Sequence, residues 1–220
     1  MIRSREFRSA TLRGMRRVLA IRHGETDWNR ESRWQGWVDR PLLPEALAQA
    51  RARGRWLAAE GVRPAVLWSS DLQRALDTAE ILGEVLGLPV TADVGLRERC
   101  GGDLEGLDRA GIEERFPGFL EEWRRGEVLA PPGGESDDEV YDRVLRSIDR
   151  IHNETPEEAT IVAVTHGGVL RILAQRGGAE PKGTPNLGGR WFEYHGHTLA
   201  SGPLIDGLPE PIDRAVHQVE

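Results

Sequence analysis

The sequence predicts an α/β fold of three layers, in which helices cover both faces of a mostly parallel central sheet. Short β-branched apolar runs, typical of buried strands, alternate along the chain with longer segments of helical 3.6-residue period. Two of the strands, Val18–Ile21 and Thr160–Val164, are each followed by a His-Gly corner. Ligands of parallel sheets bind beyond the carboxyl ends of the strands, so we expect both corners at one functional edge.

Composition narrows the class of protein. The chain has 220 residues, 39% of them hydrophobic, which suits one domain with an apolar core. A net charge of -7 argues against a nucleic-acid-binding surface. No apolar run reaches the length of about 18 residues that a membrane span needs. Cys100 is the single cysteine, which excludes an internal disulfide and suits the reducing cytoplasm.

Residues 1–14 differ in amino-acid composition from the rest of the chain. Four arginines occur there among serines and threonines, without the apolar segment of a secretory signal. We expect a disordered N-terminal extension, and Met15, just before the first strand, is an alternative start. Residues 15–220 are expected to form one domain.

The first half of this domain predicts two strand–helix pairs. A loop or short helix over Trp28–Trp37 follows the first corner, and Pro44–Gly61 reads as a helix that Gly61 ends. Its inner face is expected to carry Ala46, Leu47, Ala50, Leu57 and Ala58. Ala65–Trp68 is the next strand, and Ser69-Ser70-Asp71 offers capping groups to a helix over Leu72–Leu86. A short strand, Pro89–Ala92, then leads into a glycine-containing loop.

The second half predicts a small cap and the end of the sheet. Asp108–Arg125 reads as one or two short helices broken at Pro117-Gly118, within a cap insertion of about residues 103–136. Ser136 and Glu139 form a capping box that opens a helix to about Ile151. A helix over Val169–Arg176 follows the second corner. Two C-terminal strands are expected at Trp191–His195 and His197–Ala200.

The residues at the expected site have the chemistry of a metal-free anion site. Arg22, His23, Arg74 and His166 supply two guanidinium and two imidazole groups, and Glu98 is the one nearby candidate acid. Two guanidiniums and a protonated imidazole can hold the three oxygens of a phosphoryl group. The second histidine remains as a nucleophile, kept neutral by nearby cations and oriented through its other ring nitrogen. Nucleotide-binding glycine loops and metal-binding motifs are absent from the sequence.

These residues resemble the motifs of the histidine phosphatase superfamily, which has the phosphoglycerate-mutase-like fold. The opening motif Arg22-His23-Gly24-Glu25-Thr26 with Asn29 is matched, as is Gln35-Gly36. Further matches follow in the family's order: Ser69-Ser70-Asp71-Leu72 with Arg74, Leu96-Arg97-Glu98, Gly133-Gly134-Glu135-Ser136 and His166-Gly167-Gly168. Together they extend from Met15 to about Arg171.

The resemblance implies a phosphatase that works through a phosphohistidine. His23 would attack phosphorus, and Glu98 would protonate the leaving oxygen and then activate water. Arg22, Arg74 and His166 would hold the phosphoryl oxygens. The remaining substrate contacts implied are Asn29, Gln35, Gly36 and Gly167. No cofactor and no metal are implied, and the partner is a small phosphate ester. A homodimer is left open.

Two alternatives remain beside a phosphomonoesterase. A cofactor-dependent phosphoglycerate mutase is suggested by Arg99 and by Trp123-Arg124-Arg125, which could also be a solvated face of the cap. Against it stand the short cap, Gly168 in place of the mutase's asparagine, and Cys100-Gly101 where an acidic or aromatic pair is usual. A catalytically inactive binding protein normally lacks one of the five catalytic residues, and all five are present here.

Several residues have plainer explanations. Glu98 could form a surface ion pair with Arg97 or Arg99. His152, His195, His197 and His217 are expected to be structural or surface residues, with a metal site on the His195/His197 pair as the lesser alternative. Leu43 and Ala46 replace the hydroxyl and glycine that the family usually places at the start of its first long helix, a loss of about 0.5–2 kcal/mol in helix stability.

Overall fold

The computed structural model describes residues 16–156 and 159–206. The predicted extension at residues 1–14, His217 and residues 207–220 lie outside the described part. Six strands form one sheet in the order β3-β2-β4-β1-β5-β6. The strands are β1 (Arg16–Arg22), β2 (Pro64–Ser69), β3 (Val90–Ala92), β4 (Thr160–Thr165), β5 (Gly189–Tyr194) and β6 (Leu199–Ile205). The pairs among β1 to β4 are parallel, and β5 and β6 are antiparallel to their neighbours, so the sheet is mostly parallel as predicted.

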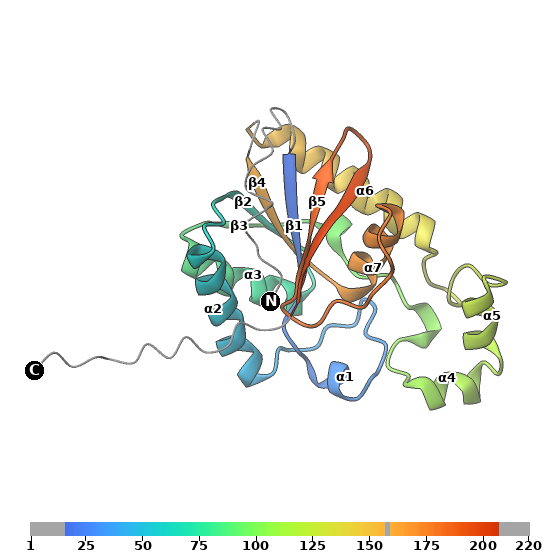
Figure 1. Ribbon diagram of the computed structural model, residues 1–220. Helices are drawn as coiled ribbons and strands as arrows, with labels where there is room; N and C mark the ends of the chain where they lie inside the picture. Colours follow the sequence, from blue (N-terminus) through green and yellow to red (C-terminus); the bar gives the residue numbers. More distant parts are fainter. Residues whose placement is uncertain (1–15, 157–158, 207–220) are drawn as a thin grey trace, which may run out of the picture.

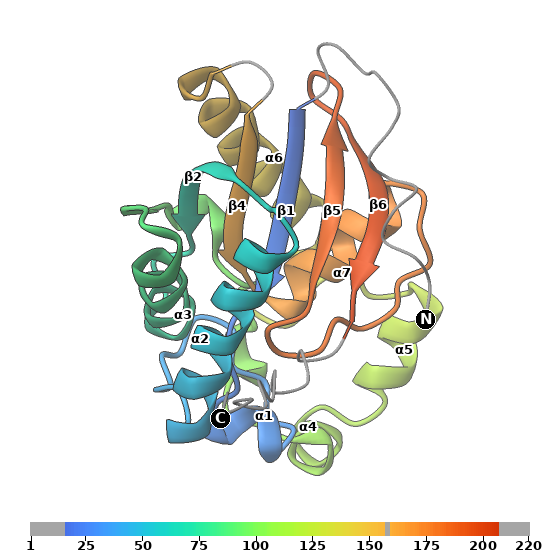
Figure 2. The same ribbon diagram turned by 60° about the vertical axis from the view of Figure 1, so that its left-hand side comes forward.

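Helices cover both faces of the sheet, which confirms the three-layer prediction (Figures 1 and 2). Leu19 and Ile21 of β1 pack against α2 (Pro44–Ala59) and α3 (Gln73–Leu86). Val18 and Ala20, which point the opposite way, pack against α6 (Asp137–Glu154) and α7 (Gly167–Arg176). This alternation is the period-two pattern of a strand that is buried on both faces.

The cap consists of two short helices beside the sheet's carboxyl edge. They are α4 (Arg109–Arg115) and α5 (Phe119–Arg125), separated at Pro117-Gly118 as predicted (Figure 1). Leu104, Ile112 and Phe119 form a small core of their own, against which Trp34 and Trp123 pack. The cap is therefore attached to the loop after the first corner, through Trp34, as well as to the chain on either side of it.

The predicted capping box is present at the start of α6. Ser136 Oγ accepts a hydrogen bond from the N–H of Glu139, whose carboxylate accepts one from the N–H of Ser136. The start of α3 agrees with the prediction in one respect, because Ser70 Oγ accepts a hydrogen bond from the N–H of Leu72 at 3.2 Å. Its N-cap, Leu72, has no side-chain cap, and Asp39 from a distant loop accepts from the N–H of Gln73 at 2.8 Å. Asp71 instead pairs with Arg97, so its carboxylate is used elsewhere.

Two further expectations need correction. Leu47 is 43% exposed, because the buried stripe of α2 runs through Ala46, Ala50, Gly54 and Leu57 and leaves Leu47 about 100° off it. The last strand, β6, begins at Leu199 rather than His197. His197 and Gly196 have φ values of 63° and 47°, so they form the turn of the hairpin and not its strand. The loop over residues 28–37 contains one short helix, α1 (Asp27–Arg30).

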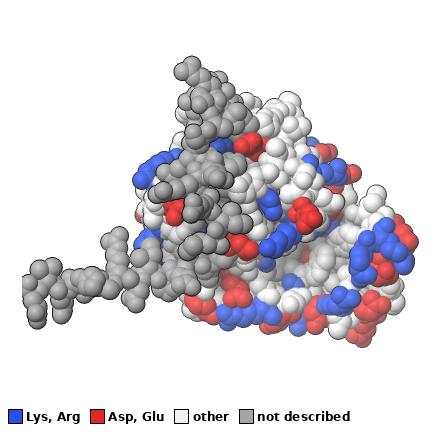
Figure 3. Space-filling model, viewed as in Figure 1, with Lys and Arg blue, Asp and Glu red and all other residues white. Residues whose placement is uncertain are grey.

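Charge is mixed on the molecular face of Figure 3, where acidic and basic side chains alternate over the described surface, the cap included. No helix among residues 16–156 and 159–206 is long and apolar enough to cross a membrane.

Candidate active site

Two neighbouring strands place the two histidines side by side. Arg22 at the end of β1 is paired in register with Thr165 at the end of β4. The N–H of His23 donates to the carbonyl of Thr165 at 3.0 Å, and the rings of His23 and His166 lie 5.2 Å apart. The expected meeting of the two His-Gly corners follows from this parallel pairing, because the chain leaves both strands at the same edge.

His23 is held as a neutral imidazole with one defined tautomer. Its Nδ1 lies 2.6 Å from the carbonyl oxygen of Gly24, which can only accept, so Nδ1 carries the proton and Nε2 keeps its lone pair. The residue is 3% exposed. Burial is the largest cause that lowers the pKa of His23 well below its usual value, and Arg74 and Arg22 lower it further. The ring is thus neutral, with burial rather than the expected cations as the main reason.

Arg74 is buried and Arg22 is partly buried, and both donate hydrogen bonds to carbonyl groups; Arg74 also lies 4.0 Å from the Asp39 carboxylate. Arg22 Nη1 donates to the carbonyl of Thr184 at 2.9 Å. Arg74 is fully buried, and its two Nη groups donate to the carbonyls of Val38 and Gly36 at 2.9 and 2.7 Å. The Nε of each arginine is buried and has no hydrogen-bond partner among the described residues. Two cations desolvated in this way favour a bound anion.

His166 is buried completely, and neither ring nitrogen has a hydrogen-bond partner in the described chain. Burial, followed by Arg74 and His23, lowers the pKa of His166 well below its usual value. The expectation of a protonated imidazole is therefore wrong for the protein by itself: His166 is neutral and offers one N–H. A phosphoryl dianion would supply the negative charge that favours the second proton.

These lowered pKa values predict a pH-dependent stability. The unfolded chain protonates both histidines near pH 6.5, whereas the folded protein does not until the pH is far lower. The unfolded state therefore binds more protons below pH 6.5, and the free energy of unfolding falls as the pH falls, by about 1.4 kcal/mol per pH unit for each histidine. Urea unfolding of wild type and of His166→Asn at several pH values between 7 and 5 measures the slope of the unfolding free energy against pH. The slope of His166→Asn should be smaller than that of wild type by the contribution of one histidine. Equal slopes for the two proteins would contradict the prediction.

Glu98 faces the same site from the loop after β3. Its Oε2 accepts a hydrogen bond from the N–H of Gly168 at 3.0 Å, and its Oε1 accepts from the N–H of Arg99 at 2.8 Å. Its carbonyl accepts from Trp37 Nε1 and from Arg143 Nη2, at 2.7 and 2.8 Å. The surface ion-pair alternative does not hold, because Arg97 pairs with Asp71 and Arg99 with Asp137.

Gly168 is needed for the position of Glu98. A Cβ at residue 168 would lie 2.3 Å from Glu98 Oε1, so any side chain there displaces the carboxylate. We expect Gly168→Ala to lower kcat by about 100-fold, the scale of a misplacement of roughly 1 Å. Stability should not fall, since alanine is favoured over glycine within a helix. Steady-state kinetics beside a thermal melt separate the two, and unchanged kcat would show that the position of Glu98 is unimportant.

The other predicted contact residues surround His23. Asn29 Oδ1 accepts from the N–H of Thr26 and from Asn186 Nδ2, which orients the Asn29 amide beside the site. Gln35 is 8% exposed, and its Oε1 is buried without a partner in the described structure. Gly36 has a φ of 50° and a Cβ there would meet the Glu105 carboxylate at 2.0 Å. Gly167 begins α7 and packs against Arg22. A Cβ at residue 167 would lie 3.2 Å from Arg22 Nε.

The structure adds residues that the sequence analysis missed. Asn186 donates to the carbonyl of His23 at 3.0 Å, and the carbonyl of Thr184 holds Arg22. Thr78 accepts from the N–H of Gly24 and donates to the carbonyl of Arg74, so it ties the first corner to α3. Thr184 and Asn186 lie in an aperiodic Gly/Pro-rich stretch that offers no sequence signal.

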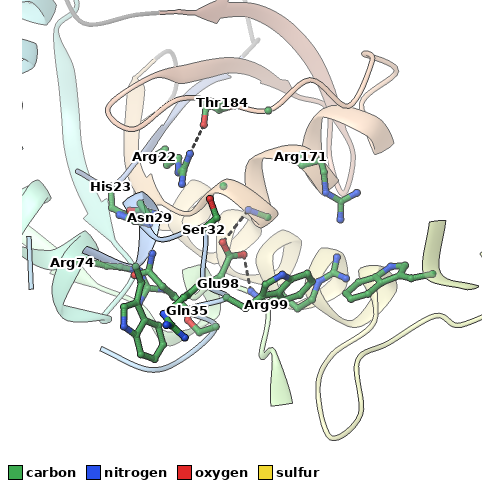
Figure 4. Close-up of a pocket in the computed structure, with 18 residues that line it drawn as sticks. Arg22, His23, Asn29, Ser32, Gln35, Arg74, Glu98, Arg99, Arg171 and Thr184 are labelled. Carbon is green, nitrogen blue, oxygen red and sulfur yellow. Dashed lines mark hydrogen bonds between the residues drawn. The ribbon is translucent and has the colours of Figure 1, made fainter. Parts of the chain in front are cut away.

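A cavity of about 460 Å³ opens over these groups. Arg22, His23, Arg74 and Glu98 line it, with Asn29, Gln35, Gly36 and Gly167 (Figure 4). His166 does not line it and is completely buried beside His23. Arg171, Arg99 and Trp123 complete the wall on the cap side. The predicted site residues therefore converge on one pocket.

Other predicted residues lie elsewhere. Arg124 and Arg125 do not line this cavity, and they pair with Glu121 and Glu127 on the exposed face of α5. His197 pairs with Asp149 at 2.7 Å, and His195 lies 3.9 Å from Glu193. Throughout residues 16–156 and 159–206, no three His, Cys, Asp or Glu side chains are grouped to hold a metal ion. His152 packs against the ring of Tyr194.

Comparison with known proteins shows the family to which this chain belongs. The model of the histidine phosphatase superfamily, branch 1, matches residues 18–189. A protein of Mycolicibacterium vanbaalenii named glucosyl-3-phosphoglycerate phosphatase is 37% identical over 199 residues, which cover 86% of this chain and 88% of that protein. A protein of Methylobacterium sp. named 2,3-bisphosphoglycerate-dependent phosphoglycerate mutase is 38% identical over 165 residues, 72% of this chain and 79% of that protein.

Solved structures of similar proteins have the same fold. The native structure of a mycobacterial glucosyl-3-phosphoglycerate phosphatase superposes with a TM-score of 0.75 at 32% identity, covering 89% of this chain and all of that one. A structure of Bacillus stearothermophilus YhfR superposes with a TM-score of 0.77 at 31% identity, covering 87% of this chain and 98% of that chain.

Proposed function

Because this chain belongs to the histidine phosphatase superfamily, we propose that it hydrolyses a small phosphate monoester through a phosphohistidine on His23. The observation that carries the proposal is the state of His23. It is a buried neutral imidazole whose Nδ1–H is held by Gly24, leaving Nε2 beside a pocket walled by Arg22 and Arg74. That combination supplies a nucleophile and the cations that stabilise a transferring phosphoryl group.

In the first step, His23 Nε2 attacks phosphorus and the phosphorus–oxygen bond to the leaving group breaks. Arg22, Arg74 and His166 hold the three peripheral oxygens throughout, and the N–H groups at the start of α7 favour the same charge. The carboxyl group of Glu98 gives its proton to the leaving oxygen, which departs as a neutral alcohol. The imidazole then carries the phosphoryl group, and Glu98 is a carboxylate.

In the second step, the Glu98 carboxylate takes a proton from water while the water oxygen attacks phosphorus. The bond between phosphorus and His23 Nε2 breaks, and the electron pair returns to the ring. Inorganic phosphate leaves, and both His23 and Glu98 recover their starting forms. The two hydrogen bonds that Glu98 accepts from Gly168 and Arg99 keep its carboxyl group at one position for both proton transfers.

The proposed substrates are small phosphorylated metabolites of the kind named for the mycobacterial relatives, glucosyl-3-phosphoglycerate among them. The short cap, with only α4 and α5, suits a reaction that must admit water. We propose that the reaction needs no metal ion and occurs in the cytoplasm; a homodimer is still an open expectation.

A phosphoglycerate mutase is the second candidate, favoured by relatives of that name. A mutase must keep water from the phosphohistidine so that the phosphoryl group returns to a phosphoglycerate. Gly168 favours the hydrolase: asparagine there, as in mutases, would displace Glu98 from its observed position. An inactive binding protein is disfavoured by the convergence of all five predicted catalytic residues around one cavity.

Phosphate release from p-nitrophenyl phosphate in the presence of EDTA tests the proposal. Wild-type protein should turn over, and rapid denaturation during turnover should trap a phosphoenzyme that is labile to acid and stable to base, as a phosphorus–nitrogen bond is. A base-labile phosphoenzyme would contradict the assignment to histidine. Absence of turnover, with isomerisation of 3-phosphoglycerate in the presence of 2,3-bisphosphoglycerate, would identify the mutase instead.

A further inference from the structure

A second pair of cations lies on the far side of Glu98 from the histidines. Arg99 and Arg171 both line the active-site cavity. In Figure 4, Arg22, His23 and Arg74 lie to one side of Glu98, and Arg99 and Arg171 lie to the other. The pair comes from two separate segments, the loop of Glu98 itself and the second turn of α7.

Arg99 is buried and incompletely paired. The residue is 5% exposed, and its Nη1 is buried without a hydrogen-bond partner in the described structure. The Trp123 ring covers its guanidinium group at 5.0 Å, which fixes the group in place. Burial and the neighbouring Arg171 lower the pKa of Arg99 to about 10, still charged at neutral pH. A desolvated N–H of a cation at a cavity wall is a donor that a ligand can satisfy.

The two arginines share one carboxylate. Arg99 Nη2 donates to Asp137, and Arg171 Nη2 donates to both oxygens of Asp137 at 3.3 and 3.4 Å. Arg143, the next arginine nearby, is already neutralised by Glu135 at 2.7 Å. Within the cluster two guanidinium groups share the one carboxylate of Asp137, and the Glu98 carboxylate is the other negative group that acts on both arginines. The two guanidinium groups together offer the paired N–H donors that a ligand carboxylate accepts.

The order of the groups across the cavity indicates which part of a substrate meets this cluster. Phosphorus must lie at His23, and the leaving oxygen must lie within reach of Glu98. The atoms beyond that oxygen continue away from His23, toward Arg99 and Arg171. A second cavity, of about 840 Å³, shares Trp34, Trp123 and Arg171 with the first, so a longer leaving group has room to extend past this pair.

We propose that Arg99 and Arg171, held by Asp137, form a subsite that selects phosphate esters whose leaving group carries a carboxylate. The proposal deepens the proposed function and rests on it. It places the carboxylate at Arg99 and Arg171 rather than at Arg124 and Arg125, which the sequence suggested for an anionic substrate and which line the second cavity but not the active-site cavity. Arg171 is the specificity residue to test, because it is 36% exposed on its side chain and contributes less to the core than Arg99.

The test compares two phosphate esters of primary alcohols that differ in whether the leaving group carries a carboxylate. 3-Phosphoglycerate has a carboxylate at its far carbon, where glycerol 3-phosphate has a hydroxymethyl group. Each is measured as a substrate and as a competitive inhibitor of p-nitrophenyl phosphate hydrolysis, in wild type, Arg171→Gln and Arg51→Gln. Arg51 is the matched control, because it is also a partly exposed arginine paired with a carboxylate, Glu84, and it lines neither cavity.

Wild type should prefer 3-phosphoglycerate, and Arg171→Gln should reduce that preference by about tenfold or more, the worth of one charged hydrogen bond, mainly through KM or Ki. Arg51→Gln should keep the wild-type ratio. A purely structural Arg171 would change both esters equally, and that result, or a wild type without preference, would overturn the subsite. If wild type hydrolyses nothing, the proposed function fails, and calorimetric binding of the two esters still decides the subsite.

Discussion

His23→Ala is expected to abolish phosphatase activity, with kcat for p-nitrophenyl phosphate falling by about 10⁴-fold or more, as when other covalent nucleophiles are removed. His166 cannot take over, because it is completely buried and does not line the cavity, whereas His23 does. Arg22, Arg74 and Glu98 keep their own backbone and carbonyl partners in this variant, so substrate binding should persist.

The measurement is phosphate release in EDTA, with phosphoenzyme trapping on the same samples and a melt to confirm folding. His197→Ala is the matched control, since it removes a histidine that is 83% exposed and paired with Asp149. It should keep wild-type activity. Turnover that survives in His23→Ala would exclude the phosphohistidine mechanism, whatever the substrate.

Glu98→Gln is expected to have an effect that depends on the leaving group. An alkyl phosphate leaves as a strongly basic alkoxide unless it is protonated, so loss of the acid should lower its kcat/KM by about 10²–10⁴-fold. p-Nitrophenolate leaves readily without a proton, so formation of phosphohistidine from p-nitrophenyl phosphate should fall much less. Glutamine can keep the hydrogen bond from Gly168 through its carbonyl oxygen and loses the one from the N–H of Arg99, because its NH2 group cannot accept. A thermal melt of the variant checks that the loop keeps its place.

Single-turnover bursts separate the two steps. With p-nitrophenyl phosphate, Glu98→Gln should release one equivalent of nitrophenol quickly and then stall, because the base that activates water is missing. Glu84→Gln removes an exposed carboxylate paired with Arg51 and serves as the control. Equal losses for alkyl and nitrophenyl esters in the burst phase would show that Glu98 positions the substrate rather than transferring a proton.

Much of the site could be predicted because it is built from strand ends. The apolar period of β1 and β4 determines that both are buried parallel strands, and such strands deliver the residues that follow them to one edge. His23 and His166 are therefore brought together by a pattern visible in the sequence. The capping box of Ser136 and the break at Pro117-Gly118 are equally local, because the groups that interact are within a few residues of each other.

Ion pairing could not be predicted in the same way. The sequence offers Arg99, Arg124 and Arg125 as equivalent cations, and the fold distinguishes them by their neighbours. Arg124 and Arg125 lie on an exposed helix face with glutamates at hand, whereas the Trp123 ring and Asp137 hold Arg99 at the cavity wall. The partner of a long charged side chain depends on which carboxylate the folded chain brings within reach.

The sequence by itself determined the layers and the strand ends, because the period of apolar residues and the chain direction of parallel strands are local properties. Only the tertiary structure decided the charge on His166, since that depends on its complete burial. It also decided that Asp39 caps α3 and that Asn186 supports His23. These contacts join segments far apart in the chain, and their distances exist only once the core has packed.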